Sequence, residues 1–321
     1  MSPAAPVTDP VTAPAVPRWL QATRTVKGYI ALTKPRIIEL LLVTTIPTMV
    51  LAANGWPSWT LLLSTLVGGA LSAGAANAFN MYIDRDIDAV MKRTRNRPLV
   101  TGAVSERGAL VFAWVLAVVS TAWFVWVVDS PLAALLSVLA ILGYVVGYTL
   151  ILKRRTSQNI VWGGAAGCMP VLIGWAAVTQ SLSWTPVLLF GIIFFWTPPH
   201  YWPLSMRFRR DYADAEVPML PVVASTHRVA VEMIAYAVAM VAVSLLLVPV
   251  AGMTWVYALV ATAAGAWFVA GCVRLYRRSE RGEDKLREMR LFRDSITYLT
   301  IVFAAILVDP FLPDALTAVA S

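Results

Sequence analysis

The sequence predicts an all-α membrane protein whose chain crosses the lipid bilayer nine times, and two observations carry this prediction. The first is composition, because 59% of the 321 residues are hydrophobic and only 14% are charged, whereas a soluble domain carries about 25% charged residues. The second is the grouping of the apolar residues into separate runs near the length of roughly 20 residues that spans a bilayer as a helix. The surplus apolar surface is therefore expected to face lipid.

Nine apolar runs follow one another along the chain, and several connections between them are short enough to be tight turns. The predicted spans cover residues 37–53, 60–82, 108–127, 131–151, 159–178, 183–204, 229–249, 254–275 and 296–313. With their flanking residues they form one predicted transmembrane domain over residues 29–315. Residues 1–28, which begin with a stretch rich in Pro, Ala and Thr, are expected to be a disordered tail, and residues 316–321 a short C-terminal tail.

The basic residues test the number of spans independently. All 26 Lys and Arg residues lie before the first predicted span or at and beyond the ends of the second, fourth, sixth and eighth, and the opposite connections contain none. Because basic loops stay on the cytoplasmic side, the N-terminus is predicted to be cytoplasmic and the C-terminus to lie outside a bacterial-type inner membrane. These loops also account for the net charge of +8, so no nucleic-acid partner is expected.

An acidic and basic stretch, NMYIDRDIDAVMKRTRNRPL, follows the second predicted span. Asn80, Asp84 and Asp88 are four residues apart and would share one face of a continuous helix, whereas Asp86 would point away. Two carboxylates and an amide oxygen suit Mg²⁺. The alternative is a solvated helix end, but the apolar neighbours of Asn80 make an unpaired polar group costly there. Bases that suit the charge of a diphosphate follow at Lys92, Arg93, Arg95 and Arg97.

A second polar segment, FWTPPHYWPLSMRFRRDYADAEVPMLPVV, ends the sixth predicted span. Pro198 and Pro199 remove two backbone donors, which predicts a kink or an unwound turn that lines a cavity. His200 and Tyr201 would then face a pocket for a flat aromatic substrate, with His200 as a ligand to the substrate's metal. A hydrogen-bonded histidine at the membrane interface is the alternative.

Two further sets of charges lie at the same predicted side of the membrane. After the sixth span, Asp211 and Asp214 either hold a second Mg²⁺ or neutralise arginines such as Arg207. Before the first span, Lys34 and Arg36 either anchor the helix at the interface or contact a diphosphate. The residue types alone leave both choices open.

The longer strings around these residues are similar to a known family. Asn80-x₃-Asp84-x₃-Asp88 resembles the first aspartate-rich motif of the intramembrane UbiA-type prenyltransferases. The strings NMYIDRDIDAVMKRTRNRPLVTG, ALTKPR, FFWTPPHYWPLSM and PMLPVV resemble the branch of that family that farnesylates heme, from about residue 29 to residue 312. One departure is that this branch generally has paired acids where this chain has Arg210 and Asp211, which weakens the case for a second Mg²⁺.

The resemblance implies nine transmembrane helices around a lipid-open central cavity, and it implies a reaction. Farnesyl diphosphate would ionise to an allylic cation, which would add to a vinyl group of heme B, and water would complete heme O for a downstream heme A synthase. Asn80, Asp84 and Asp88 would hold Mg²⁺ and form the catalytic set, with Asp211 as a further metal ligand. The substrates would be bound by Lys34, Arg36, Lys92, Arg93, Arg97, His200, Tyr201, Arg207 and Asp211.

Two alternatives belong to different classes of protein. A prenyltransferase of the same family that acts on an aromatic quinone precursor would share the Asn80–Asp88 motif, but the TPPHYW and PMLPVV segments favour the heme branch. A transporter with an intramembrane ion path would place acids near the middle of the membrane. The acids in this chain lie at the ends of spans, which disfavours transport.

Overall fold

The computed structural model describes residues 18–312 apart from residue 284, without the side chains of residues 18–21 and 36–42. The described chain is helical and contains no β-strand. Its α-helices are α1 (Arg18–Leu32), α2 (Pro35–Ala52), α3 (Trp59–Ile83), α4 (Arg85–Val90), α5 (Glu106–Trp126), α6 (Pro131–Leu142), α7 (Asn159–Thr179), α8 (Trp184–Arg207), α9 (Arg209–Asp214), α10 (Leu220–Val223), α11 (Thr226–Ala251), α12 (Trp255–Glu280) and α13 (Glu288–Val308). A π-helix, η1 (Gly143–Leu152), continues α6, and a 3₁₀ turn, η2 (Asp309–Phe311), follows α13.

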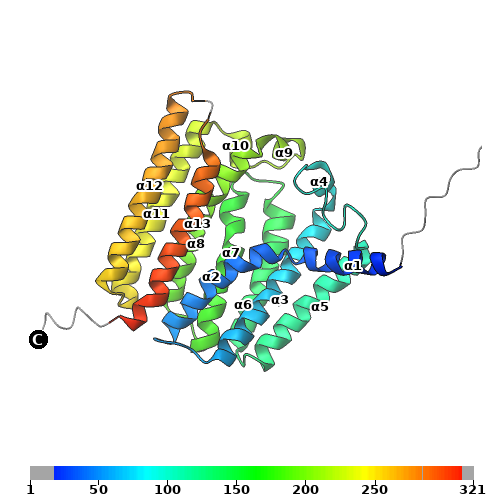
Figure 1. Ribbon diagram of the computed structural model, residues 1–321, viewed down its shortest axis with the longest axis horizontal. Coiled ribbons are helices and arrows are strands. Elements are labelled where there is room, and N and C mark those ends of the chain that lie inside the picture. The colour runs from blue at the N-terminus through cyan, green and yellow to red at the C-terminus, as the bar shows by residue number, and fades with distance from the viewer. Residues whose placement is uncertain (1–17, 284, 313–321) are drawn as a thin grey trace, which may run out of the picture.

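The long helices pack as a closed ring. Sequence neighbours lie side by side, as in α3 with α5, α7 with α8 and α11 with α12, and α13 packs against α2 to close the ring. Figure 1 shows the short helices α4, α9 and α10 gathered at one end of the long helices, while α1 lies across them. The polar segments after α3 and α8 are therefore brought to the same end of the molecule.

Every predicted span overlaps one helix of this ring. Seven helices are long and apolar enough to cross a bilayer, namely α3, α5, α6 with η1, α7, α11, α12, and α13 with η2. The first and sixth predicted spans correspond to α2 and α8, which have 18 and 24 residues. The prediction of an all-α membrane protein is confirmed, and the total of nine crossings stays a prediction.

Helix α1 corrects the predicted end of the N-terminal tail. Residues 18–28 are helical rather than disordered. The reason is tertiary contact, because Leu32 is fully buried and the ring of Tyr29 packs edge-on against Phe112 of α5 at 5.0 Å. The remaining predicted tail, residues 1–17, lies outside the described residues, as do residues 313–321 of the C-terminal end.

The spacing of the acidic motif predicts one continuous helix, but the structure interrupts the helix within the motif. Helix α3 ends at Ile83, and Asp84 (φ −86°, ψ 6°) separates it from α4. The four-residue register nevertheless survives the break, since the Asp84 N–H donates to the Asn80 carbonyl and the Asp88 N–H to the Asp84 carbonyl, both at 2.9 Å. The three side chains of the motif therefore stay close together.

Helix α8 runs unbroken from Trp184 to Arg207 through Pro198, Pro199 and Pro203, so the predicted unwound turn is wrong. Each proline leaves the carbonyl four residues earlier without its helical donor. Packing offsets this loss, because α8 lies against α7, α11 and α13. The prolines therefore sit within a helix that its neighbours hold in shape.

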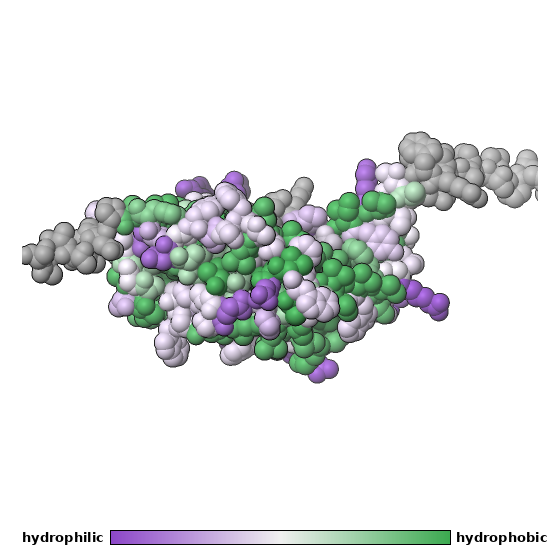
Figure 2. All heavy atoms as spheres, turned by 90° about the horizontal axis from the view of Figure 1, so that it is seen from below, coloured by the Kyte–Doolittle hydropathy of each residue, from purple (hydrophilic) through white to green (hydrophobic). Residues whose placement is uncertain are grey.

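The end of the molecule opposite α4, α9 and α10 has few strongly hydrophilic residues on its surface. In Figure 2, which views this end, hydrophilic residues form small, separate patches among apolar ones. Exposed tryptophans lie in or beside the connections at this end, at Trp56, Trp59, Trp184 and Trp255. Tryptophan is enriched where a membrane meets water, so these positions fit an interfacial belt.

A buried carboxylate ties the end of α13 to the start of α12. Asp309 is 6% exposed and accepts hydrogen bonds from the Thr254 N–H (3.1 and 3.2 Å) and the Thr254 hydroxyl (2.6 Å). Asp309→Ala leaves that N–H without a partner, so we expect the free energy of unfolding to fall by about 1–3 kcal/mol. Thermal unfolding in detergent measures this loss. The control Glu283→Ala removes an exposed acid and should change the midpoint little, and equal shifts in both variants would contradict the role of Asp309.

Candidate active site

A cavity of about 410 Å³ lies where the polar segments after α3 and α8 meet. Its walls come from the α1–α2 connection, the α3–α4 region, η1, α7, α8 and α9. The charged and amide side chains that line it are Lys34, Asn80, Asp88, Arg93, Arg97 and Lys153. The ring-bearing side chains are Tyr144, Tyr148, Trp196, His200, Tyr201 and Tyr212.

Asn80 and Asp84 form the centre of the first charged group. The Asn80 Oδ1 accepts a hydrogen bond from Lys34 Nζ at 2.9 Å, and its Nδ2 donates to Asp84 Oδ2 at 2.6 Å. Lys153 Nζ donates to the same Asp84 oxygen at 2.5 Å. Asp84 is fully buried, and its other oxygen, Oδ1, has no hydrogen-bond donor in the described part of the chain; Arg154 Nη2 lies 3.8 Å away. A buried carboxylate oxygen without a donor suits a cation.

Asp88 forms the centre of the second charged group. Its Oδ2 accepts from Arg97 Nη1 at 2.5 Å, and Asp88 is 2% exposed. The hydroxyl of Thr94 donates to the Asp88 carbonyl at 3.0 Å, which holds the segment after α4 folded back on the motif. This fold-back explains how Arg97, nine residues later, reaches the acid that precedes it.

A pair of tyrosine hydroxyls joins the two polar segments of the chain. Arg93 Nη2 donates to the Tyr212 hydroxyl at 3.3 Å, and the Tyr212 and Tyr201 hydroxyls are 2.8 Å apart. Arg93 follows α4, whereas the tyrosines belong to α9 and α8. The two constellations that the sequence indicates separately therefore form one site.

Lys34 completes the cavity from a left-handed backbone conformation (φ 52°, ψ 64°), which is uncommon for a residue with a side chain. Burial, with a smaller effect of the positive charges of Arg97 and Lys153, lowers the pKa of Lys34 to about 7 against the opposing effect of Asp88 and Asp84. The cluster thus holds more positive charge than its two carboxylates neutralise. An anion with several charges would relieve this imbalance.

Asp86 lies outside the cavity, as its position in the motif predicts. Its side chain is 59% exposed and accepts two hydrogen bonds from Arg154, at 2.6 and 2.7 Å. These hydrogen bonds lower the pKa of Asp86 to about 2. Asp86 therefore serves a local ion pair.

The structure does not bring every predicted residue to the cavity. Lys92 and Arg207 are exposed and do not line it. On α9 the neighbour of Asp211, Tyr212, is the residue that points inward, because successive residues of a helix differ by about 100° in direction. The prediction of Asp211 as a substrate and metal ligand is therefore not supported by its position. The side chain of Arg36 lies outside the described residues.

The metal set that the sequence predicts consists of two carboxylates and an amide. In the part of the chain that the structure describes, no group of three or more His, Cys, Asp or Glu side chains could hold a metal ion. Asn80, Asp84 and Asp88 remain together, with Asp84 behind the cavity wall and the other two lining it. A metal in this place would need further oxygen ligands, which a diphosphate can supply.

Sequence reasoning missed the contribution of η1. Its π-helical turns present Tyr144 and Tyr148 to the cavity with their rings stacked at 5.4 Å, and Lys153 follows directly. Gly163 makes room for Tyr148, since a Cβ there would lie 2.1 Å from the Tyr148 ring. A π-helix often marks a functional site, but no residue pattern in this stretch distinguishes it from an ordinary apolar helix.

The predicted position of His200 in the cavity agrees with the structure. Its ring lies between Trp196, with centroids 4.0 Å apart, and Phe292 of α13, at 4.6 Å. Its Nδ1 is 2.7 Å from the Ser295 hydroxyl. The histidine is therefore fixed in orientation at the cavity wall.

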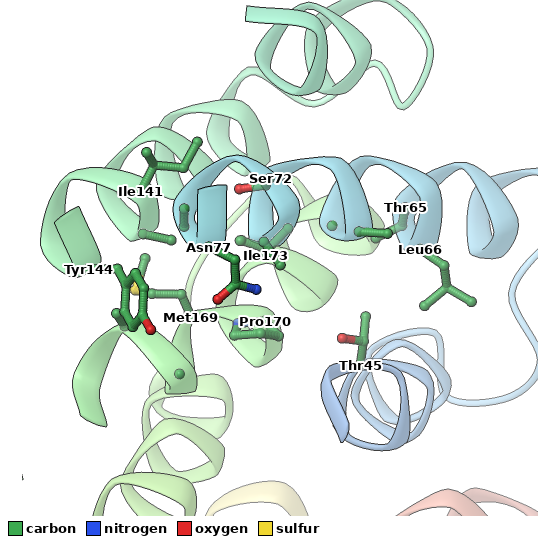
Figure 3. A pocket seen from close by; sticks show the side chains of 17 residues that line it. Thr45, Thr65, Leu66, Ser72, Asn77, Ile141, Tyr144, Met169, Pro170 and Ile173 are labelled. Carbon is green, nitrogen blue, oxygen red and sulfur yellow. The ribbon is translucent and has the colours of Figure 1, made fainter. Parts of the chain in front are cut away.

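A second pocket, of about 140 Å³ and mostly apolar, adjoins the charged cavity. It lies among α2, α3, α6 with η1, and α7, and it shares Tyr144 and Gly167 with the charged cavity. Figure 3 shows Tyr144 and Asn77 near one end of this pocket, and Leu66 and Thr45 near the other. The Asn77 amide donates to the Thr33 carbonyl at 3.0 Å, which satisfies one of the few polar side chains in this mostly apolar wall.

Comparison with known proteins gives a consistent result. Residues 41–296 match the UbiA prenyltransferase family. The protoheme IX farnesyltransferase of Clavibacter michiganensis is 62% identical over 290 residues, which cover 90% of this chain and 94% of that protein. A structure of digeranylgeranylglyceryl phosphate synthase superposes with a TM-score of 0.73 at 15% identity, covering 89% of this chain and 98% of that one. A UbiA homolog from Archaeoglobus fulgidus bound to DMAPP and Mg²⁺ gives 0.55 at 17% identity, covering 87% and 99%.

Proposed function

This chain belongs to the UbiA prenyltransferase family, and from that premise we infer that it transfers a farnesyl group from farnesyl diphosphate to a vinyl group of heme B, giving heme O and diphosphate. The observation that carries this inference is the junction of the charged cavity with the apolar pocket at Tyr144 and Gly167. A prenyl diphosphate has one highly charged end and a long apolar chain. The junction offers an environment of each kind to one molecule.

We propose that Asn80, Asp84 and Asp88 hold Mg²⁺ when substrate is bound. The donor-free Oδ1 of Asp84 and the near-complete burial of both carboxylates support this assignment. Carboxylate and amide oxygens are suitable ligands, with diphosphate oxygens and water completing the coordination. When bound, Mg²⁺ neutralises charge on the diphosphate leaving group.

The cations of the cavity have a direct role in breaking the C–O bond. As the bond breaks, negative charge grows on the diphosphate, and preformed positive groups stabilise that charge without having to reorganise. Lys34, Arg93, Arg97 and Lys153 line the cavity and can supply these contacts. The apolar pocket keeps water away from the allylic cation until the acceptor reacts.

The acceptor is placed by the aromatic wall of the same cavity. Trp196, His200 and Tyr201 line the cavity together with the residues of the acidic motif's segment. These rings suit a flat, largely apolar macrocycle, which favours heme over the small phenolic acids of quinone synthesis. We further propose that the charged end of the protein faces the cytoplasm of a bacterial-type inner membrane and that heme O passes to a heme A synthase.

Incubation of purified protein with heme B, farnesyl diphosphate and Mg²⁺, followed by mass spectrometry, tests the reaction. We expect heme O to form, and formation of a prenylated quinone precursor but no heme O would overturn the assignment. We also expect EDTA to abolish turnover and added Mg²⁺ to restore it. Full activity in the presence of EDTA would contradict the metal proposal while leaving the transfer reaction intact.

A further inference from the structure

The imidazole of His200 has both of its faces covered. Trp196 stacks on one face at an interplanar angle of 14°, and Phe292 stacks on the other face at 25°. The indole N–H of Trp196 donates to the Ser295 carbonyl at 2.8 Å, which fixes α8 against α13 beside this stack. Only the edge of the imidazole is left to interact with a ligand in the cavity.

The hydrogen bonds of Ser295 determine which imidazole nitrogen carries the proton. The Ser295 hydroxyl donates its single hydrogen to the Phe292 carbonyl at 2.6 Å, because a carbonyl can only accept. Toward His200 the same oxygen can therefore only accept, so Nδ1 must be the nitrogen that carries hydrogen. Ser295 is fully buried, so water does not compete for this contact.

The other nitrogen, Nε2, is then left with a free lone pair. It has no hydrogen-bond partner among the described residues. It is also not fully enclosed by protein atoms. His200 lines the charged cavity. A neutral imidazole with Nδ1–H donated to a protein oxygen and Nε2 free is the form that binds metals.

We propose that Nε2 of His200 binds the iron of the heme substrate as an axial ligand and that Ser295 is a positioning residue that fixes the required tautomer. This inference rests on the proposed function, because it takes heme as the acceptor. Imidazole is a common axial ligand of heme iron. The stacked rings hold the imidazole in one orientation, which in turn limits how the macrocycle can lie in the cavity.

Spectroscopy of the protein loaded with heme B tests the ligand directly. We expect absorption and resonance Raman spectra of the wild type to show nitrogen ligation, and His200→Ala to lose that signature and regain it with added imidazole. Affinity for farnesyl diphosphate should change little in this variant. If His200→Ala still makes heme O and keeps the wild-type heme spectrum, the iron ligand is wrong while the transfer reaction stands.

Ser295 has its own readout. Loss of a partner behind a metal-bound histidine commonly weakens binding by about 10–100-fold, so we expect Ser295→Ala to weaken heme binding and shift the iron–histidine stretching frequency. Ser295→Thr, which keeps the hydroxyl, should retain the wild-type frequency. An unchanged frequency in Ser295→Ala would overturn the positioning role.

Ser120→Ala is a matched control for Ser295→Ala. Ser120 is also fully buried and also donates to the carbonyl three residues earlier, at 3.0 Å, but it lies on α5 away from the cavity. We expect its heme spectrum to equal that of the wild type, and a shift equal to that of Ser295→Ala would contradict the proposal. If the wild type itself neither binds heme nor makes heme O, the proposed function fails as well.

Discussion

Asp84→Asn and Asp88→Asn are each expected to lower kcat/KM for heme O formation by at least about 100-fold, the loss typical when a group that stabilises transition-state charge is removed. Both changes keep the shape of the side chain but remove the charge proposed to hold Mg²⁺. Asp84→Asn removes the ion-pair partner of Lys153, and Asp88→Asn removes that of Arg97, so the two variants disturb different bases, both partly exposed. Agreement between the two variants would therefore point to the shared chemistry and not to one local disturbance.

Asp86→Asn provides the control from the same motif. Asp86 carries the same charge within four residues of both acids, but it is exposed and pairs with Arg154 outside the cavity. We expect its activity to stay within about fivefold of the wild type, since an exposed ion pair contributes roughly 0–1 kcal/mol. Equal losses in all three variants, measured on samples with the same thermal midpoint, would contradict a specific role for the two buried acids.

Lys153→Met is expected to weaken binding of farnesyl diphosphate by about 10–100-fold, because a hydrogen bond to a charged group is worth about 1.5–3 kcal/mol. The methionine keeps the apolar stem and removes the ammonium group that lines the cavity. Isothermal titration in the presence of Mg²⁺ measures the change. The variant also removes the closest ion-pair partner of the buried Asp84, so its thermal unfolding midpoint, compared with that of the wild type, separates a loss of folding from a loss of binding.

Lys92→Met tests whether Lys92 contacts the diphosphate, as the sequence predicts, or lies outside the site, as the structure places it. Lys92 lies in the basic run after the acidic motif, where the sequence predicts a diphosphate contact, yet it is exposed and does not line the cavity. We expect Lys92→Met to bind farnesyl diphosphate with nearly wild-type affinity. A loss as large as that of Lys153→Met would show that Lys92 contacts the diphosphate as the sequence predicts.

The positions of the membrane helices could be predicted because they depend on local composition. Apolar runs of the required length become helices wherever lipid is the solvent, since the backbone must satisfy its own hydrogen bonds there. Each predicted span accordingly overlaps a helix. The separation of Asp86 from Asp84 and Asp88 was likewise predictable from spacing, even though Asp84 interrupts the helix.

The remaining features depend on contacts between distant segments. The N-terminal helix α1 is held against α5 by the contact of Tyr29 with Phe112, a residue far away in the sequence. Lys153 reads as one more basic residue in a short loop, and only the fold places it against an acid 69 residues earlier. Tyr212 rather than Asp211 faces the cavity because of the rotation of α9 about its own axis. No local sequence pattern specifies this rotation.

The two internal ion pairs, Asp84 with Lys153 and Asp88 with Arg97, imply thermodynamic coupling between metal and diphosphate. Mg²⁺ alone would have to displace these bases from the acids, and diphosphate alone would have to draw the bases away from them. Each ligand therefore removes the other's competitor, and by linkage each raises the affinity for the other by the same factor. The cavity should consequently discriminate against free Mg²⁺ and against metal-free diphosphate, and fill only when both arrive.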